Sequence, residues 1–194
     1  MKDVSTRVLV AYETKLGSTA EVAQFIGSVL VESGLSATVL PISEVRDLAA
    51  FDMVIIGSAI RYDHWLPGAV DLVEQNRPVL SGKPVAFFFT CLTLAKPTAA
   101  AHRKAEGYAD KLRALSPDVI PLTIGKFAGV LDFARTPWPA RLALRLLSLA
   151  TGVKQGDYRD WSAIRAWCED LCESLGSDAS KRGLSSTPKH ALHM

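Results

Sequence analysis

The loop Glu13–Thr19 carries residue types that suit the binding of an anion. Hydroxyl side chains, one lysine and one glycine stand between a predicted strand at Arg7–Tyr12 and the start of a helical pattern. Backbone N–H groups at a helix N-terminus and the helix dipole both favour negative charge. We therefore predict a phosphate site here, and its candidate residues are Thr14, Lys15, Leu16, Gly17, Ser18 and Thr19.

A purely structural explanation covers part of this loop. Ser18 and Glu21 form an S-x-x-E capping box, in which Ser18 would only cap its helix. Capping accounts for these two residues but leaves Thr14 and Gly17 unexplained. The prediction of a phosphate site therefore depends on the whole strand–loop–helix context.

Motifs that the sequence lacks exclude several kinds of phosphate-binding site. There is no G-x-x-x-x-G-K-[ST], which P-loop NTPases need, and no G-x-G-x-x-G after the first predicted strand, which dinucleotide-binding proteins use. A receiver domain needs an acidic cluster and a phospho-acceptor Asp after the third strand, where this sequence reads Gly57-Ser58-Ala59. A mononucleotide held without a metal ion remains, and FMN fits.

Two further loops, Ala59–Leu66 and Thr90–Ala95, follow predicted strands. Ligands of doubly wound sheets bind at the carboxyl ends of strands, so these loops are the other places to look for chemistry. Tyr62 and Trp65 can stack on a ring system there, or they can pack the loop onto the sheet.

The same region holds the candidate catalytic residues Arg61 and His64. The forked guanidinium of Arg61 suits a carboxylate, or it could stabilise negative charge on a reduced cofactor. A surface ion pair with Asp63 or another acid is the alternative. The imidazole of His64 can carry a proton, whereas a hydrogen bond to the backbone is its alternative role.

The three cysteines give no sign of a disulfide framework or a metal site. Cys91 ends a predicted strand and has no evident base beside it, so we expect a small pocket or core residue. Cys168 and Cys172 lie one helical turn apart on an apolar stripe, without a second pair of ligands. An odd number of cysteines suits a reducing compartment.

Strands and helices are predicted to alternate along the chain. This order implies βαβ units with right-handed crossovers. The predicted fold class is α/β, with a doubly wound five-stranded parallel sheet of order 2-1-3-4-5. The predicted strands are Arg7–Tyr12, Ala37–Pro41, Phe51–Ser58, Val85–Cys91 and one within Val119–Val130; the predicted helices are Ser18–Gly34, Pro67–Asn76, Thr98–Leu115 and one that Asp160 caps.

Composition indicates one folded domain. The 194 residues are 48% hydrophobic and 22% charged, as in globular proteins. We expect a domain over 1–175, with an insertion at about 131–157, and a flexible tail over 176–194. The net charge of +2, without a dense basic block, gives no sign of a nucleic-acid partner. The first apolar run is too short for a signal peptide, so we expect a cytoplasmic protein.

The insertion holds an apolar helical pattern over 138–150, interrupted by the narrow polar stripe of Arg141, Arg145 and Ser148. Such a helix can lie in a membrane surface, with leucines in lipid and arginines at the headgroups. It can also pack on its own domain or on a second subunit. The oligomeric state, including a homo-oligomer, stays open.

Several motifs resemble one family. Thr14–Thr19 is similar to the flavodoxin phosphate loop T-x-x-G-[ST]-T. Gly57–Trp65 resembles the G-[AS]-[AS]-I-R-Y-x-H-aromatic stretch of the menaquinone-dependent protoporphyrinogen dehydrogenases, which are flavodoxin-like proteins. Three further segments also look like that family: Ala86–Pro97, Phe127–Leu131 with the insertion, and Asp160-Trp161. The resemblance covers about residues 7–175.

The resemblance implies a flavodoxin-like fold with non-covalent FMN and no metal. Thr14–Thr19 would hold the phosphate. Residues flanking the isoalloxazine would be Ser58, Ala59, Ile60, Arg61, Tyr62, Thr90, Cys91, Leu92, Thr93, Leu94 and Ala95. The implied reaction oxidises protoporphyrinogen IX to protoporphyrin IX in heme biosynthesis and passes the electrons to a respiratory quinone. A lipid-soluble quinone favours peripheral contact with the inner face of the cell membrane through 138–150.

Three other functions stay open. A flavodoxin electron carrier is usually acidic, which the net charge of +2 and the pI near 8.5 disfavour. An NAD(P)H:quinone oxidoreductase would have its flavin bleached by NADPH. A degenerate flavodoxin domain acting as an interaction platform would bind no flavin.

Overall fold

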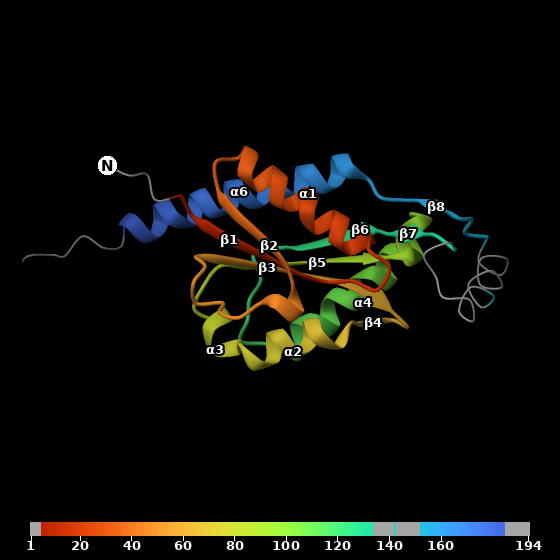
Figure 1. The fold of residues 1–194 in the computed structure, drawn as a ribbon, viewed down its shortest axis with the longest axis horizontal. Coiled ribbons are helices and arrows are strands. Elements are labelled where there is room, and N and C mark those ends of the chain that lie inside the picture. Colours follow the sequence, from red (N-terminus) through yellow and green to blue (C-terminus); the bar gives the residue numbers. More distant parts are fainter. Residues whose placement is uncertain (1–4, 134–141, 143–151, 185–194) are drawn as a thin grey trace, which may run out of the picture.

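The computed structural model describes residues 5–133, 142 and 152–184. A parallel sheet in the order β2-β1-β3-β5-β6 forms its centre (Figure 1), and a short β4 pairs antiparallel with β3. The predicted α/β class and strand order are confirmed, because these five strands are the five we expected. The bounds are β1 Arg7–Glu13, β2 Ser36–Pro41, β3 Met53–Arg61, β4 His64–Trp65, β5 Val85–Cys91 and β6 Ile124–Ala128.

Helices cover both faces of the sheet. In Figure 1, α1 (Ser18–Glu32) and α6 (Trp161–Leu184) lie on one face. The opposite face carries α2 (Pro67–Gln75), α3 (Arg77–Leu80) and α4 (Ala99–Leu115). Short 3₁₀ turns follow β2 at Ile42–Glu44 and β5 at Leu92–Ala95. This layering is why the central strands read as continuous apolar runs.

The core is divided by the sheet into two layers. One layer joins α2, α3 and α4 to the sheet through Val73, Leu80 and Leu112. The other joins α1 and α6 to it through Ile26 and Ile164. Every residue of β5 is buried. A sheet buried on both faces holds the carboxyl ends of its strands at fixed spacing, and those ends carry the candidate loops.

The bounds of two elements differ from the expected ones. β3 continues past Ser58 to Arg61, because Ile60 and Arg61 pair with Trp65 and His64 in a hairpin. Helix α6 continues past Gly176 to Leu184, where we expected a tail to begin. A helix-interior glycine costs only about 1 kcal/mol, and no proline stands before Leu184 to end the helix.

The insertion begins and ends in a small antiparallel ladder of β7 (Val130–Leu131) and β8 (Gly156–Asp157). In Figure 1 this ladder lies at the end of the molecule where β1, β3 and β5 end. The apolar stretch predicted to contact membrane, 138–150, lies outside the described residues except for Leu142, whose side chain is exposed. The last ten residues of the predicted tail also lie outside them.

Candidate functional site

The β1–α1 loop is shaped by a hydrogen bond and a left-handed glycine. Gly17 has φ 92° and donates its N–H to Thr14 Oγ1 at 3.0 Å. This conformation is one that glycine adopts readily. The first intrahelical bond joins Glu21 N–H to Gly17 O at 3.1 Å. The N–H groups of Ser18, Thr19 and Ala20 therefore precede the helical ladder and point out of its N-terminus, where an anion can accept from them.

The predicted capping box is wrong. Gly17, not Ser18, is the N-cap, and Ser18 is the first helical residue. A serine there has helical backbone geometry, so its hydroxyl does not cap the helix. Glu21 instead accepts a 2.6 Å hydrogen bond from Arg159 Nη1. Ser18 is half-buried and Lys15 is exposed beside it.

Thr19 is less accessible than the other predicted phosphate ligands. Its side chain is fully buried, and its hydroxyl lies 2.8 Å from that of Thr90, which is 3% exposed. This pair ties the start of α1 to the end of β5. Thr19 and Thr90 therefore connect two of the predicted loops.

Strand register brings the three loops to one edge. Glu13 lies opposite Ser58, Ser58 opposite Phe89, and Ala59 opposite Thr90. Because parallel strands end at the same edge, the loops after β1, β3 and β5 converge there. The structure thus brings the predicted site regions together.

The loop after β3 is a tight β-hairpin. Arg61 pairs with His64, and the two residues between them have positive φ, 50° at Tyr62 and 62° at Asp63. Positive φ at both central positions is the type I′ pattern, which Asn-Gly normally supplies. Left-handed backbone costs an ordinary residue about 1–2 kcal/mol. Other contacts must therefore stabilise the turn.

Those contacts reach across to α4. Tyr108 Oη donates to Asp63 Oδ1 at 2.6 Å, and Lys104 Nζ lies 2.9 Å from the same oxygen. Lys111 Nζ donates to the Asp63 carbonyl at 2.9 Å. The hydrogen bond from Tyr108, and then the one from Lys104, lowers the pKa of Asp63. Burial and the bond to Asp63 raise the pKa of Tyr108, which keeps it a donor.

Trp65 anchors the other strand of the hairpin. It is 7% exposed, packs edge-on to Phe87 and Phe89, and donates Nε1–H to Tyr108 O at 3.1 Å. Trp65 therefore packs the loop onto the sheet. Tyr62 is 84% exposed on the same turn, so its ring is available to a ligand.

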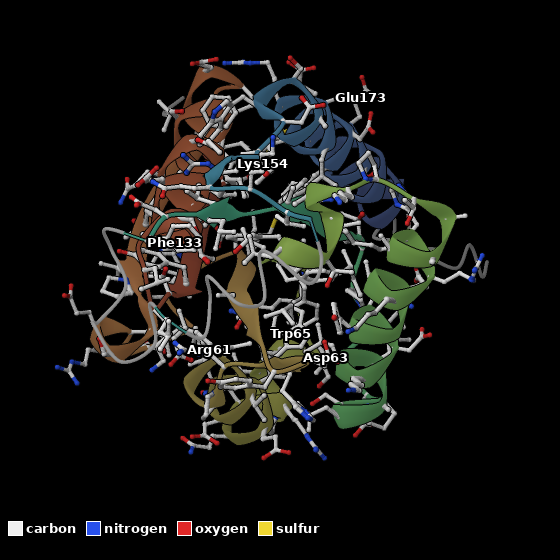
Figure 2. The ribbon with its side chains drawn as sticks, turned by 90° about the vertical axis from the view of Figure 1, so that its right-hand side faces the viewer. Arg61, Asp63, Trp65, Phe133, Lys154 and Glu173 are labelled. Atoms are coloured by element: carbon white, nitrogen blue, oxygen red, sulfur yellow. The ribbon has the colours of Figure 1, made fainter. Side chains whose placement is uncertain are left out.

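Arg61 and His64 are both exposed, on neighbouring positions of the hairpin. Figure 2 shows Trp65 and Asp63 on the α4 side and Arg61 on the side away from α4. Asp63 pairs with Lys104, and no ion pair of Arg61 occurs in the described part of the chain. The Arg61 guanidinium instead lies 5.3 Å from the centre of the Tyr62 ring. Arg61 thus remains able to receive a carboxylate.

Ser58 has a structural role. Its hydroxyl accepts from Leu66 N–H at 3.0 Å and donates to Ala59 O at 2.9 Å, and its side chain is fully buried. These bonds close the base of the hairpin. Ala59 and Ile60 are half-buried above it.

The loop after β5 is a compact 3₁₀ turn. Cys91 is 4% exposed, as predicted for a pocket or core residue, and burial raises the pKa of its thiol. Thr93 Oγ1 lies 3.1 Å from Tyr108 Oη. Leu94 is buried, whereas Leu92 and Ala95 are half-buried. The turn is therefore joined to the hairpin anchor through Tyr108.

The other two cysteines belong to the core beneath α6, as predicted. Burial raises the pKa of Cys168 to about 12, so its thiol stays protonated. Within residues 5–133 and 152–184 no cluster of His, Cys, Asp and Glu could hold a metal ion. In the same parts of the chain, no helix has the length and apolarity that a bilayer span requires.

Two site-supporting residues were missed by sequence reasoning. Glu13 Oε2 accepts from Ala69 N–H at 2.9 Å, and a Cβ on Gly68 would lie 2.8 Å from that oxygen. Glu13 thus satisfies the start of α2, and the E-T-x-x-G-S string gave no hint of it. Arg159 binds Glu21 in the first turn of α1. The sequence alone could not indicate this contact, because it depends on the segment after β8 lying beside that helix.

The arrangement fits a phosphorylated ring cofactor. The α1 N-terminus offers a phosphate N–H groups that have no hydrogen-bond partner in the described part of the chain, and the hairpin offers an exposed aromatic side chain at the same sheet edge. Thr14 and Gly17 set the loop's shape, whereas Ser58, Thr19 and Thr90 hold the edge together.

Known proteins share this sequence pattern and fold. The chain is 26% identical over 172 residues to the Escherichia coli K12 protein named protoporphyrinogen IX dehydrogenase [quinone], covering 85% of this chain and 94% of that protein. It is 29% identical over 182 residues to the Leishmania major protein of the same name, covering 88% and 77%. The solution structure of two-electron reduced Megasphaera elsdenii flavodoxin matches with a TM-score of 0.50 at 14% identity, covering 82% and 98%.

The family comparison covers most of the chain. The profile of the flavodoxin domain family matches residues 9–156, a span that contains all three predicted loops. The chain belongs to the flavodoxin domain family.

Proposed function

We propose that this protein is an FMN-dependent oxidoreductase that oxidises protoporphyrinogen IX to protoporphyrin IX and passes the electrons to a quinone. The observation that carries the proposal is the pairing of the α1 N-terminus, whose first N–H groups have no partner among the described residues, with the exposed Tyr62 on an anchored hairpin at the same edge. The names of the Escherichia coli and Leishmania major relatives support the substrate and the acceptor.

The chain's own residues would bind and orient. The N–H groups of Ser18 and Ala20, with the Ser18 hydroxyl, would hold the phosphate, and Lys15 would add positive charge. Tyr62 would lie against the ring, and the loop Thr90–Ala95 would flank it. FMN, when bound, supplies the redox chemistry that links substrate to quinone.

Arg61 is suited to the substrate's carboxylates. It is exposed at the edge of the hairpin and points away from the α4 anchor, where a propionate could form two hydrogen bonds with its guanidinium (Figure 2). His64 lies opposite it in the ladder and can take up a proton released by oxidation. Contact with the inner face of the cell membrane through 138–150 stays a prediction.

An absorbance spectrum followed by anaerobic reduction tests the proposal. The purified protein should show the bands of oxidised flavin, and these should bleach on addition of protoporphyrinogen IX and return on addition of a quinone. Flavin that ignores protoporphyrinogen but bleaches with NADPH would make the protein an NAD(P)H:quinone oxidoreductase. Flavin inert to both would favour an electron carrier, and failure to bind flavin after reconstitution would overturn the proposal.

A further inference from the structure

A buried arginine connects the end of the insertion to the helix that begins the candidate phosphate site. Arg159 follows β8, and its side chain is 7% exposed. Its Nε and Nη2 bind the Asp157 carboxylate at 2.9 and 2.6 Å, and its Nη1 binds Glu21 Oε2 at 2.6 Å. The guanidinium also lies 4.5 Å from the centre of the Trp161 ring. Its orientation is therefore fixed on several sides.

Glu21, the partner of Arg159, lies in the first turn of the helix whose N-terminus would bind the anion. Glu21 immediately follows the three N–H groups that precede the helical ladder of α1. At 1.5 Å per residue, it lies only about 4.5 Å along the axis from Ser18. A carboxylate in the first turn stabilises a helix by itself, but it repels a phosphate bound at the same N-terminus. This axial separation is shorter than the Debye length of about 8 Å, so salt would only partly screen the repulsion between the carboxylate and a phosphate bound at that N-terminus.

We propose that Arg159 is a positioning residue that makes the α1 N-terminus selective for a phosphorylated flavin, by holding the Glu21 carboxylate in an ion pair. This inference rests on the proposed function, since it assumes that FMN is the ligand. It adds that recognition of the phosphate depends on a residue 138 positions after Glu21 in the sequence, supplied by the segment after the insertion.

The chain offers a matched control for this ion pair. Arg165, also on the α6 side, binds Glu32 Oε2 at 2.7 Å, which is the last residue of α1. Arg165 also lies over an aromatic ring, that of Phe25, at 5.5 Å. Both arginines therefore join α1 to the segment around α6, but only Arg159 does so at the end that would bind phosphate.

The experiment measures the affinity of the flavin-free, full-length protein for FMN and for riboflavin, which lacks the phosphate. Arg159→Gln should weaken FMN binding about tenfold and riboflavin binding less than twofold. Glu21→Gln added to that variant should restore FMN affinity, because the repelling carboxylate is gone. Arg159→Lys should retain most of the affinity, and Arg165→Gln should change neither ligand.

Several results of this experiment would contradict the inference. Equal weakening of FMN and riboflavin by Arg159→Gln, or failure of Glu21→Gln to restore FMN binding, would show a merely structural role and overturn this inference alone. Wild-type protein that binds neither flavin would overturn both this inference and the proposed function. Thermal unfolding of each variant identifies loss of fold. If Arg159→Gln does not fold, the Glu21→Gln single variant tests the inference instead. It should bind FMN at least as tightly as wild type, and weaker binding would overturn the inference.

Discussion

The hydroxyl of Tyr108 donates a 2.6 Å hydrogen bond to the carboxylate of Asp63, across 45 residues of sequence. Tyr108 is buried on α4, whereas Asp63 occupies the second left-handed position of the hairpin turn. This single contact therefore joins the helix layer to the strained turn that exposes Tyr62. The backbone of Tyr108 also accepts from Trp65, so one residue fastens both the turn and β4.

Removing this hydroxyl should destabilise the protein. Tyr108→Phe keeps the ring packed against Phe89 but deletes the donor to Asp63. A hydrogen bond to a charged group contributes about 1.5–3 kcal/mol, and the half-exposed carboxylate can regain water, so we expect a loss of about 1 kcal/mol. Urea denaturation measures it. Thr93→Val, which removes the weaker 3.1 Å contact to the same hydroxyl, should cost less; the reverse order would contradict the argument.

The contribution of Asp63 should depend on pH. Its pKa is lowered from the ordinary value of 3.8, mainly by the Tyr108 hydrogen bond and then by the one from Lys104. A carboxyl group whose pKa is lower in the folded state adds stability above its unfolded pKa and loses it as the pH falls through the folded value. The stability difference between wild type and Asp63→Asn should therefore be constant near neutral pH and shrink below about pH 4. A difference that grows on acidification would contradict the assignment.

The hairpin should show a trade between stability and cofactor binding. Tyr62→Asn places a residue that tolerates left-handed backbone at φ 50°, and should raise stability by about 0.5 kcal/mol. The same change removes the exposed ring, so FMN affinity should fall about tenfold. Calorimetric unfolding and flavin titration measure the two effects. Tyr62→Phe, which keeps the ring, should change neither much, and equal FMN affinity in Tyr62→Asn would remove Tyr62 from the site.

The elements of this fold that could be predicted are those with a characteristic pattern of neighbouring residues in the sequence. Continuous apolar runs identified β1 and β5, because a strand buried on both faces needs them. The hairpin was not predictable as a turn, since Tyr62-Asp63 lacks the glycine or asparagine that such turns favour. It forms because Lys104, Lys111 and Tyr108 bind Asp63 from a helix far along the chain.

The candidate site likewise has a part that could be predicted from neighbouring residues and a part that could not. The phosphate loop was visible in sequence, because its hydroxyls, glycine and helix start are neighbours. The supporting pairs were not: Arg159 with Glu21 and Thr19 with Thr90 join residues 138 and 71 positions apart. Neither pair has a local signature, and the apparent capping box even gave Glu21 a different partner. Tertiary hydrogen bonds therefore assign roles that residue type and spacing leave open.

The Thr19–Thr90 pair makes a prediction about coupling. Both hydroxyls are buried and lie 2.8 Å apart, so Thr19→Val leaves the Thr90 hydroxyl buried without its partner. An unsatisfied buried hydroxyl costs about 1–3 kcal/mol, and Thr90→Val should cost a similar amount. The double variant Thr19→Val, Thr90→Val should lose much less than the sum, because both polar groups are gone.

A double-mutant cycle on the free energy of unfolding measures this coupling. Ser28→Ala on the exposed side of α1, where the hydroxyl donates to the Phe25 carbonyl, is a suitable comparison and should add independently to Thr90→Val. Strict additivity of the two threonine changes would show that the hydroxyls do not depend on each other. Strong coupling would instead mean that the α1 N-terminus, and with it the predicted phosphate site, is held in register with the end of β5 by this one buried contact.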